Sequence, residues 1–496
     1  MNSEHVKKSD IAQSEENVLA FWNENNIFQK SLEKKSPKGD FVFYDGPPFA
    51  TGLPHYGHLL AGTIKDIIPR YKTMQGYRVP RTWGWDCHGL PIENLIEKEL
   101  GLETKKDIEE YGIEKFNEAA RDSVLRYESE WKHYVPRSGR WIDMEHPYMS
   151  MQSSYMESVW WIFSELHKKK LTKEDFKAMH LCPRCETTLS NFEVNQGYED
   201  VTDISVTAKF KVVGEENTYF LAWTTTPWTL PGNVALAVGE DIEYIKAEII
   251  ESNGEEKIGM SYIFAKTLLD NLFPGAYPEG IEEGSKLKFY TDYLVDSRNI
   301  KIRVIDLKNS DLIGTSYEPV FDYYQQQPDL ENRANGWKVY AADFVTTEDG
   351  TGIVHIAPAF GSDDMELGKK HYLPFIQHVA KNGTFKDDFA FATDGTSMQG
   401  MFVKKKGDYM STDIEIIKRL AHDEKLFSKQ KLVHSYPHCW RCDTPLLNYA
   451  TTSWYVNVPE IKNKLLKSNK KIRWVPEHIG EGRFGKWLEG ARDWAL

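Results

Sequence analysis

Cysteine is scarce in this sequence, with five residues among 496. So few cysteines exclude the disulfide framework of a small secreted protein. Long apolar runs are missing as well, since no stretch approaches the roughly 18 consecutive apolar residues of a transmembrane helix. The first residues also lack the apolar core of a secretory signal. We therefore expect a cytoplasmic protein with no membrane contact.

An excess of positive charge is lacking too, because the formal net charge is −13. Proteins that bind nucleic acids usually contact phosphates through clustered Lys and Arg. Composition therefore gives no support for RNA binding, although it does not forbid a local basic groove. What the chain has is a globular balance of 41% hydrophobic and 27% charged residues. Its length predicts about two to four domains.

The first part of the chain alternates between helical patterns and short apolar runs. Apolar residues recur at helical spacing in 14–30 and 55–71, and buried strands are expected at 40–44 and 79–85. A strand, a glycine-rich turn and a helix in this order open many nucleotide-binding α/β folds. Two further charged segments are expected to be helical: 92–135 and 150–170.

The pattern changes near residue 200. From there to about 395, short β-like runs alternate with turns, which predicts a separate and mostly β domain. The expected strands are 206–213, 219–223, 234–238, 244–250, 302–305 and 353–356. After about 395 the pattern is mixed again, with helices expected near 411–426 and over 474–496.

Two histidines, His55 and His58, open the helix at 55–71. Side chains three residues apart share one face of a helix. The helix N-terminus adds unpaired N–H groups and a partial positive charge, which together suit a phosphate. Gly57, between the histidines, lets the backbone approach a ligand. The H-x-G-H string alone is more typical of two ordinary surface histidines near a helix start.

Three consecutive threonines, Thr224, Thr225 and Thr226, precede a turn fixed by proline. Their hydroxyls would alternate between faces. A second string, 350–364, contains His355 and Asp364. Taken singly, the first string is compatible with an edge strand and a loop, and the second with a strand and a β-turn.

Four of the five cysteines form two C-x-x-C pairs, Cys182 with Cys185 and Cys439 with Cys442. This pattern in an intracellular chain is typical of a structural zinc site. A redox role is less favoured, because there are two pairs and neither lies in a thioredoxin-like pattern. Two neighbouring histidines, His180 and His438, could compete as ligands. The fifth cysteine, Cys87, is expected to be a packing residue.

The loop 45–52, the H-x-G-H string and the block 84–93 (GWDCHGLPIE) together resemble the isoleucine-specific class I aminoacyl-tRNA synthetases. The four-letter signature of that class, HIGH, corresponds to residues 55–58, with Tyr56 where the consensus has Ile. The threonine run and the string 350–364 resemble the editing insert of isoleucyl-, valyl- and leucyl-type synthetases. The resemblance covers the whole chain, but only about half of the length of the family.

The resemblance implies an adenylate-forming site. The carboxylate of isoleucine would attack the α-phosphate of ATP, held with Mg²⁺, and pyrophosphate would leave. His55, Gly57 and His58 would bind ATP, and the two histidines would stabilise charge on the phosphates. Asp86 would hold the substrate ammonium. The implied substrate-binding residues are Pro47, Pro48, Asp86, His88 and Glu93.

The resemblance also implies a proofreading site. A hydrophobic pocket that accepts isoleucine cannot strongly reject valine, which is one methylene smaller. A second site would therefore hydrolyse valyl-tRNA with a positioned water. By the resemblance, Thr224, Thr225 and Thr226 line this pocket, and Asp364 binds the ammonium of the wrong amino acid. His355 and Thr226 would close the pocket against isoleucine.

The implied fold class is α/β. The first half of a class I Rossmann-type parallel sheet domain would be interrupted by a mostly β, barrel-like editing domain and a zinc-knuckle module. The N-terminal helix and the first Rossmann part would span 1–180, the first zinc knuckle and linker 181–199, the editing domain 200–395 and the return segment with the second knuckle 396–496. We expect a monomer whose partners are isoleucine, ATP and an isoleucine-accepting tRNA.

The second ATP signature of the class, a KMSKS-like string, is not found in the sequence. The nearest string is 467–470 (KSNK), which we expect to lie in a solvated loop. A partial polypeptide with negligible isoleucine-dependent ATP–pyrophosphate exchange is therefore expected. Two other functions stay open, a free-standing aminoacyl-tRNA deacylase and a non-catalytic tRNA-binding module. Intact His55, His58 and Asp86 favour the ligase.

Overall fold

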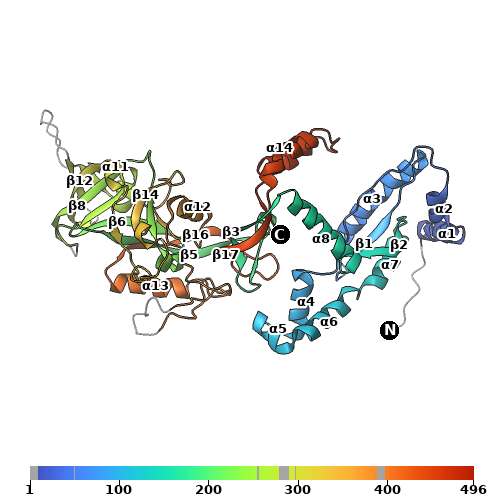
Figure 1. Cartoon of the computed structure of the whole chain (residues 1–496), viewed down its shortest axis with the longest axis horizontal. Helices are drawn as coiled ribbons and strands as arrows, with labels where there is room; N and C mark the ends of the chain where they lie inside the picture. Colours follow the sequence, from blue (N-terminus) through green and yellow to red (C-terminus); the bar gives the residue numbers. More distant parts are fainter. Residues whose placement is uncertain (1–8, 50, 254–255, 279–289, 296–297, 388–396) are drawn as a thin grey trace. The chain divides into compact units, whose positions relative to one another are not determined.

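The computed structural model describes residues 9–49, 51–253, 256–278, 290–295, 298–387 and 397–496. The chain divides into two compact units, Met1–Thr172 and Lys173–Leu496, and Figure 1 labels many of their helices and strands. Within the described part, no helix is long and apolar enough to cross a membrane.

The N-terminal unit is mostly helical and contains one short parallel sheet. Its elements are, in chain order, α1 (Asp10–Glu24), α2 (Ile27–Glu33), α3 (Tyr56–Met74), β1 (Thr82–Trp85), α4 (Leu90–Leu100), α5 (Lys105–Tyr111), α6 (Ile113–Val124), α7 (Glu128–Arg137), β2 (Asp143–Met149) and α8 (Ser153–Lys168). Strands β1 and β2 pair in parallel with Gly84 opposite Tyr148, and α4 to α7 form the long crossover that such a pair requires. A core of large side chains, including Trp83, Trp85 and Trp131, packs around β1.

Two predicted helical stretches are present but broken, mainly at residues with left-handed backbone. The helix expected over 14–30 splits into α1 and α2 at Asn26, which has the left-handed φ of 50°. The stretch 92–135 divides into α4 to α7, with Gly101 and Gly112 at positive φ between successive helices. Left-handed backbone cannot continue a right-handed helix, and glycine adopts it at little cost.

The strand predicted at 40–44 is wrong. Asp40 makes only an isolated parallel bridge with Arg78, and Phe49 makes a second one with Asp86. Between these points Val42 and Tyr44 are 68% and 92% exposed. An apolar run forms a buried strand only where other elements cover it. Among the described residues nothing covers these two side chains.

The second unit is built mainly of strands. Its elements are β3 (Thr172–Cys182), β4 (Thr187–Thr188), α9 (Asn191–Val194), β5 (Tyr198–Val212), β6 (Thr218–Thr224), η1 (Pro227–Gly232), β7 (Ala235–Val238), β8 (Tyr244–Ser252), β9 (Ser261–Ala265), η2 (Lys266–Leu268), α10 (Leu269–Leu272), β10 (Ala276–Pro278), β11 (Tyr290–Val295), β12 (Ile300–Leu307), α11 (Asn309–Leu312), β13 (Tyr317–Glu318), η4 (Arg333–Asn335), β14 (Lys338–Ala341), β15 (Ile353–Ile356), α12 (Ser362–His371), α13 (Ser411–His422), β16 (Leu426–Pro437), β17 (Leu447–Val456), α14 (Val458–Asn469), α15 (His478–Glu481), α16 (Arg483–Glu489) and β18 (Trp494–Ala495).

One large mixed sheet organises this unit. Its central order is β10-β11-β12-β8-β9-β6-β15-β7-β14, and the long strands β5 and β16 pair antiparallel beside it. All four residues of β7 are buried, as expected for a strand covered on both faces. A second sheet has the order β18-β17-β3-β4. The six strands predicted between 200 and 395 are confirmed, whereas the predicted boundary at 395 lies outside the described residues.

The C-terminal predictions are partly wrong. The segment 474–496 is not one helix, because α15 and α16 are short and β18 pairs with β17, placing Ala495 opposite Tyr455. Gly482 separates the two helices and Gly490 ends the second. Residues 467–470 form the end of α14 and its C-cap, not a loop.

Candidate functional site

Two histidines cap the N-terminus of α3. The Gly57 N–H donates to His55 Nδ1 at 3.1 Å, and the His55 N–H donates to His58 Nδ1 at 3.2 Å. The two ring centroids lie 3.7 Å apart. Because both Nδ1 atoms accept, each ring carries its proton on Nε2. The pKa of His58 lies below its usual value, first because of burial and then because of the charges of His55 and Lys65.

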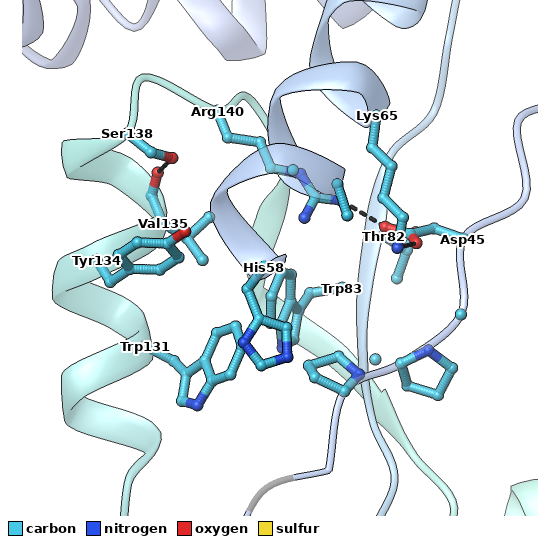
Figure 2. A pocket seen from close by; sticks show the side chains of 16 residues that line it. Asp45, His58, Lys65, Thr82, Trp83, Trp131, Tyr134, Val135, Ser138 and Arg140 are labelled. Atoms are coloured by element: carbon cyan, nitrogen blue, oxygen red, sulfur yellow. Dashed lines mark hydrogen bonds and ion pairs between the residues drawn. The ribbon is translucent and has the colours of Figure 1, made fainter. Parts of the chain in front are cut away.

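A cavity of about 240 Å³ lies beside His58 (Figure 2). Lys65 and Arg140 both pair with the Asp45 carboxylate on its wall, so the lining has an excess of positive charge. Trp131 also lines the cavity, and its indole N–H donates to the carbonyl of Gly52, at the end of the loop 45–52, at 2.8 Å. The cavity therefore joins a helix N-terminus, two cations and a fixed loop, which suits an anionic ligand.

The residues predicted for this site do not all reach the cavity. Three of them line it: Pro47, Pro48 and His58. Five are not among the lining residues: His55, Gly57, Asp86, His88 and Glu93.

Asp86 follows directly after β1, at the carboxyl end of the parallel pair. Its N–H donates to the Pro48 carbonyl at 3.0 Å, and its half-buried carboxylate accepts the Ser150 hydroxyl at 3.4 Å. His88 is exposed, while Glu93 lies on α4 and pairs with Lys105 at 3.6 Å. Asp86 is thus held next to the proline wall of the cavity.

The threonine run lies where two neighbouring strands end. Strands β6 and β15 pair in parallel, with Val354 opposite Trp223, so their carboxyl ends meet at one edge of the sheet. Thr224 is the last residue of β6, and its Oγ1 accepts the Thr226 N–H at 3.1 Å. This local bond turns the chain sharply into η1. We call residues 224–233 the threonine loop.

A chain of hydrogen bonds connects the threonine loop with His355 on β15. Thr229 Oγ1 donates to the Thr226 carbonyl at 2.8 Å and lies 2.8 Å from His355 Nε2. Asn233 Nδ2 lies 3.4 Å from His355 Nδ1. An amide nitrogen only donates, so His355 Nδ1 accepts, and its Nε2 carries the proton and donates to Thr229. Burial lowers the pKa of His355 to about 4, so the ring is neutral at pH 7.

Asp364 lies in the first turn of α12, close to the end of β15. Its Oδ2 accepts the N–H of Ala357, the residue after β15, at 2.8 Å. Burial raises the pKa of Asp364 to about 7, although the Ala357 N–H opposes the shift. Bringing a cation next to this carboxyl would favour its ionised form.

Thr229 and Asn233 belong to this network but were not predicted as site residues. Thr229 is 5% and Asn233 2% exposed, and the Tyr317 hydroxyl donates to Asn233 Oδ1 at 2.7 Å. A usable signal was the three-residue spacing of Thr226 and Thr229, which the 3-10 turn η1 brings together.

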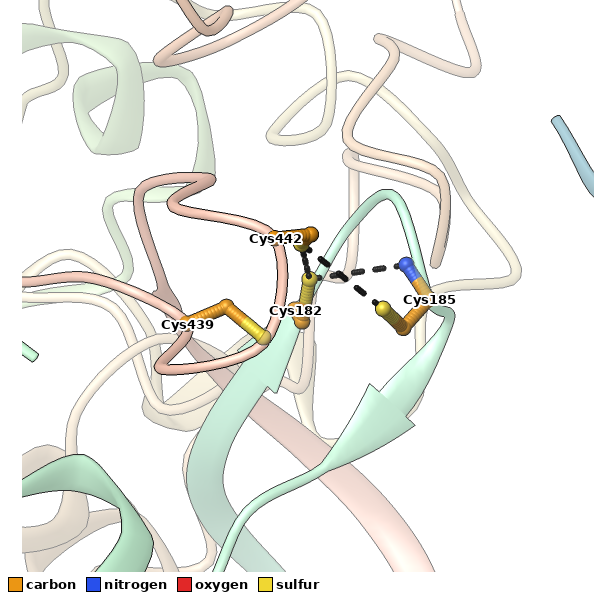
Figure 3. Close-up of side chains that lie close together, drawn as sticks. All are labelled: Cys182, Cys185, Cys439 and Cys442. Carbon is orange, nitrogen blue, oxygen red and sulfur yellow. Dashed lines mark hydrogen bonds between the residues drawn. The ribbon is translucent and has the colours of Figure 1, made fainter. Parts of the chain in front are cut away.

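The four paired cysteines lie together in the second unit, as predicted. Figure 3 shows Cys182 and Cys185 on the β3–β4 hairpin facing Cys439 and Cys442 on the loop after β16. All four sulfurs lie within 4.8 Å of one another, and two separations from Cys442 Sγ are 3.5 and 3.8 Å.

This donor set fits a tetrahedral metal ion. Four sulfurs at about 2.3 Å from one ion are separated by about 3.8 Å, close to the separations found. The cluster is buried, with no side chain more than 9% exposed. His438 is outside the group, and its Nδ1 donates to the Tyr436 carbonyl at 3.0 Å. His180 is outside the group as well.

A family model described as tRNA synthetases class I (I, L, M and V) matches residues 17–496, so the chain belongs to this family of aminoacyl-tRNA synthetases. Within the family it is 47% identical over 513 residues to the isoleucine--tRNA ligase of Treponema denticola, covering 99% of this chain and 43% of that protein. It is 44% identical to the isoleucine--tRNA ligase of Bdellovibrio bacteriovorus, covering 98% of this chain and 42% of that protein. The corresponding ligase of Chlamydia abortus is also 44% identical, with 99% and 43% covered. The chain therefore spans less than half of the length of these relatives.

Proposed function

We propose that this chain is part of an isoleucine--tRNA ligase that forms isoleucyl-adenylate from ATP and proofreads valyl-tRNA. The observation that carries the proposal is the presence of two different sites in one chain. One is a histidine-capped helix beside a cationic cavity, and the other is a buried threonine–histidine network next to Asp364. A plain deacylase has no use for the first site, and a binding module has no use for the second.

At the N-terminal site, catalysis rests on positioning and charge neutralisation. The isoleucine carboxylate attacks the α-phosphate of ATP, and pyrophosphate leaves. His55 and His58 direct their Nε2–H groups to the phosphates, and Gly57 allows close backbone approach. Mg²⁺ bound together with ATP would neutralise part of the phosphate charge.

The amino acid lies at the end of β1 in this proposal. The Asp86 carboxylate holds the ammonium, and Pro47 and Pro48 form a wall of the side-chain pocket. His88 and Glu93 are further substrate contacts, and for Glu93 this requires release from Lys105. Open α/β sheets commonly bind ligands at the carboxyl ends of their strands, which favours this location.

At the second site, water hydrolyses the ester of a wrongly charged tRNA. The water oxygen bonds to the ester carbonyl carbon as one of its O–H bonds breaks. The bond from that carbon to the tRNA oxygen then breaks, and the proton from the water ends on that oxygen and restores the tRNA hydroxyl. Asp364 binds the ammonium of valine, and Thr224, Thr225 and Thr226 orient the reacting groups. His355 is held by Thr229 and closes the pocket, together with Thr226, against isoleucine.

The remaining assignments follow the same scheme. Residues 1–180 carry the first Rossmann part, 200–395 the barrel-like editing domain, and 181–199 and 396–496 the two zinc knuckles with their flanking segments. Cys182, Cys185, Cys439 and Cys442 hold a structural Zn²⁺, for which the buried all-sulfur set is typical. The protein acts as a monomer in the cytoplasm and takes an isoleucine-accepting tRNA.

Two assays test the proposal. The 496-residue chain is given isoleucine-accepting tRNA charged with valine or with isoleucine, and faster release of valine is expected. The polypeptide isolated from source cells is then assayed for ATP–pyrophosphate exchange, which isoleucine should stimulate more than valine. Deacylation without any ATP–pyrophosphate exchange would mean that the protein is a free-standing deacylase and not a ligase. Absence of both activities would contradict the proposal.

A further inference from the structure

A buried cluster of charged side chains contacts the threonine loop. Lys404, Asp203 and Asp413 have side chains only 1%, 1% and 2% exposed. Lys404 Nζ pairs with Asp203 and lies 3.0 Å from Asp413 Oδ2. His434 Nε2 lies 2.9 Å from the other oxygen of Asp203. A buried ion-pair cluster need not stabilise a fold, since well-packed apolar side chains in the same place often give equal or greater stability.

The cluster is attached to the threonine loop through one peptide. Asp413 Oδ1 accepts the Trp228 N–H at 3.0 Å. On the other side of the same residue, the Trp228 carbonyl accepts from His378 Nε2 at 2.8 Å. The next residue is Thr229, whose hydroxyl contacts His355. Asp413 therefore fixes the backbone directly before Thr229, whose hydroxyl connects the threonine loop with His355 on β15.

The rest of the cluster fixes Asp413. Lys404 has the left-handed φ of 49°, a strained conformation for a residue with a side chain. Its ammonium is held between Asp203 on β5 and Asp413 on α13, so α13 is tied to the sheet on which the threonine loop begins. Without this cation the buried carboxylates of Asp203 and Asp413 would lose the ion pair that they share, and an uncompensated buried carboxylate is costly.

We infer that Asp413 is a positioning residue for ester hydrolysis: through the Trp228 N–H it holds the threonine loop in register with His355, and Lys404 holds Asp413 in turn. The inference rests on the proposed proofreading function. Its direct consequence is that the hydrogen bond, more than the charge, determines the rate of hydrolysis.

The test compares two substitutions at one position. Asp413→Asn keeps an oxygen that can accept the Trp228 N–H but places an amide NH2 next to Lys404, so it keeps the hydrogen bond and loses the ion pair. Asp413→Ala loses both. The matched control is Glu415→Ala, which breaks the Glu415–Lys418 ion pair on the outside of the same helix. Each variant is made in the 496-residue chain, and deacylation of valyl-tRNA is measured well below the lowest melting temperature.

For Asp413→Ala we expect kcat to fall at least about tenfold with KM nearly unchanged, because misplaced groups slow chemistry more than binding. Asp413→Asn keeps the bond to the Trp228 N–H but loses the contact with Lys404, so its kcat should fall clearly less than that of Asp413→Ala. Glu415→Ala should have the kcat of the unchanged chain. An unchanged kcat for Asp413→Ala, or an equal loss in both Asp413 variants, overturns the inference.

Hydrogen–deuterium exchange without substrate is a second test, because it measures directly how firmly the threonine loop is held. Peptides that cover 224–233 should exchange faster in Asp413→Ala than in Asp413→Asn, and equal exchange in the two variants overturns the inference. If the unchanged chain does not hydrolyse valyl-tRNA, the proofreading proposal fails. The exchange data still decide whether Asp413 positions the loop.

Discussion

The two candidate sites differ in how completely the described chain fixes them. In the N-terminal unit His55 is exposed, His58 is half-buried, and apolar residues of α3 such as Leu60 and Ile67 are 67% and 59% exposed. In the second unit Thr229 and His355 are 5% and 7% exposed and belong to one continuous hydrogen-bonded network.

The two sites also differ in whether their charged side chains already have partners. In the N-terminal cavity Lys65 and Arg140 already pair with Asp45, so an anionic ligand must compete with that carboxylate. At the second site Asp364 has its pKa raised to about 7 and accepts one backbone N–H, so a ligand ammonium would supply its missing countercharge. The site that we propose for hydrolysis therefore has its threonine–histidine network already hydrogen-bonded before a ligand binds, and such preorganisation lowers reaction barriers.

The largest expected effect concerns the four-cysteine cluster, which lies in the second unit. Cys439→Ser should abolish metal binding and lower the melting temperature of the second unit, because a structural zinc ion contributes on the order of 10 kcal/mol to folding. Metal content by mass spectrometry and calorimetry measure the two effects. The control is Cys87→Ser, a buried cysteine of the N-terminal unit outside the cluster. Unchanged metal content in Cys439→Ser would contradict the assignment.

The second largest effect is expected for the carboxylate of Asp364. Asp364→Ala should lower kcat/KM for valyl-tRNA hydrolysis about ten- to a hundredfold, since a hydrogen bond to a charged group contributes about 1.5–3 kcal/mol. Asp363→Ala is the matched control, because Asp363 lies one residue earlier on α12 and is exposed. Equal rates for the two variants would remove Asp364 from the site.

The ionisation of Asp364 should appear in the pH dependence of hydrolysis. Asp364 with a pKa of about 7 is protonated and neutral in acid, so it cannot pair with an ammonium there. The kcat/KM for hydrolysis, corrected for spontaneous ester loss, should rise with pH through about 7. Asp364→Asn cannot ionise and should lose this rise. A rise that persists in the variant would assign it to another group.

Sequence patterns predicted the parts of these sites that depend on local chemistry. His55 and His58 were placed at a helix start because capping is decided within one turn, and the cysteines were grouped by their spacing. The strand at 40–44 failed because burial depends on distant elements that the pattern does not contain. The contact of Thr229 with His355 was missed because it depends on the register of β6 against β15, more than a hundred residues later. The roles of Asp86 and Asp364 stay predictions.

The smallest expected effect probes the parallel pair beneath the N-terminal cavity. A Cβ at Gly84 would lie 2.2 Å from the ring of Tyr148, which stacks on Tyr155. Gly84→Ala should therefore destabilise this unit by about 1–3 kcal/mol, a shift of several degrees in its calorimetric transition. Gly52→Ala is the control, since a Cβ there meets nothing within 4 Å. If both variants melt alike, β1 and β2 are not packed as closely as this, and the N-terminal site is fixed even less firmly than the site in the second unit.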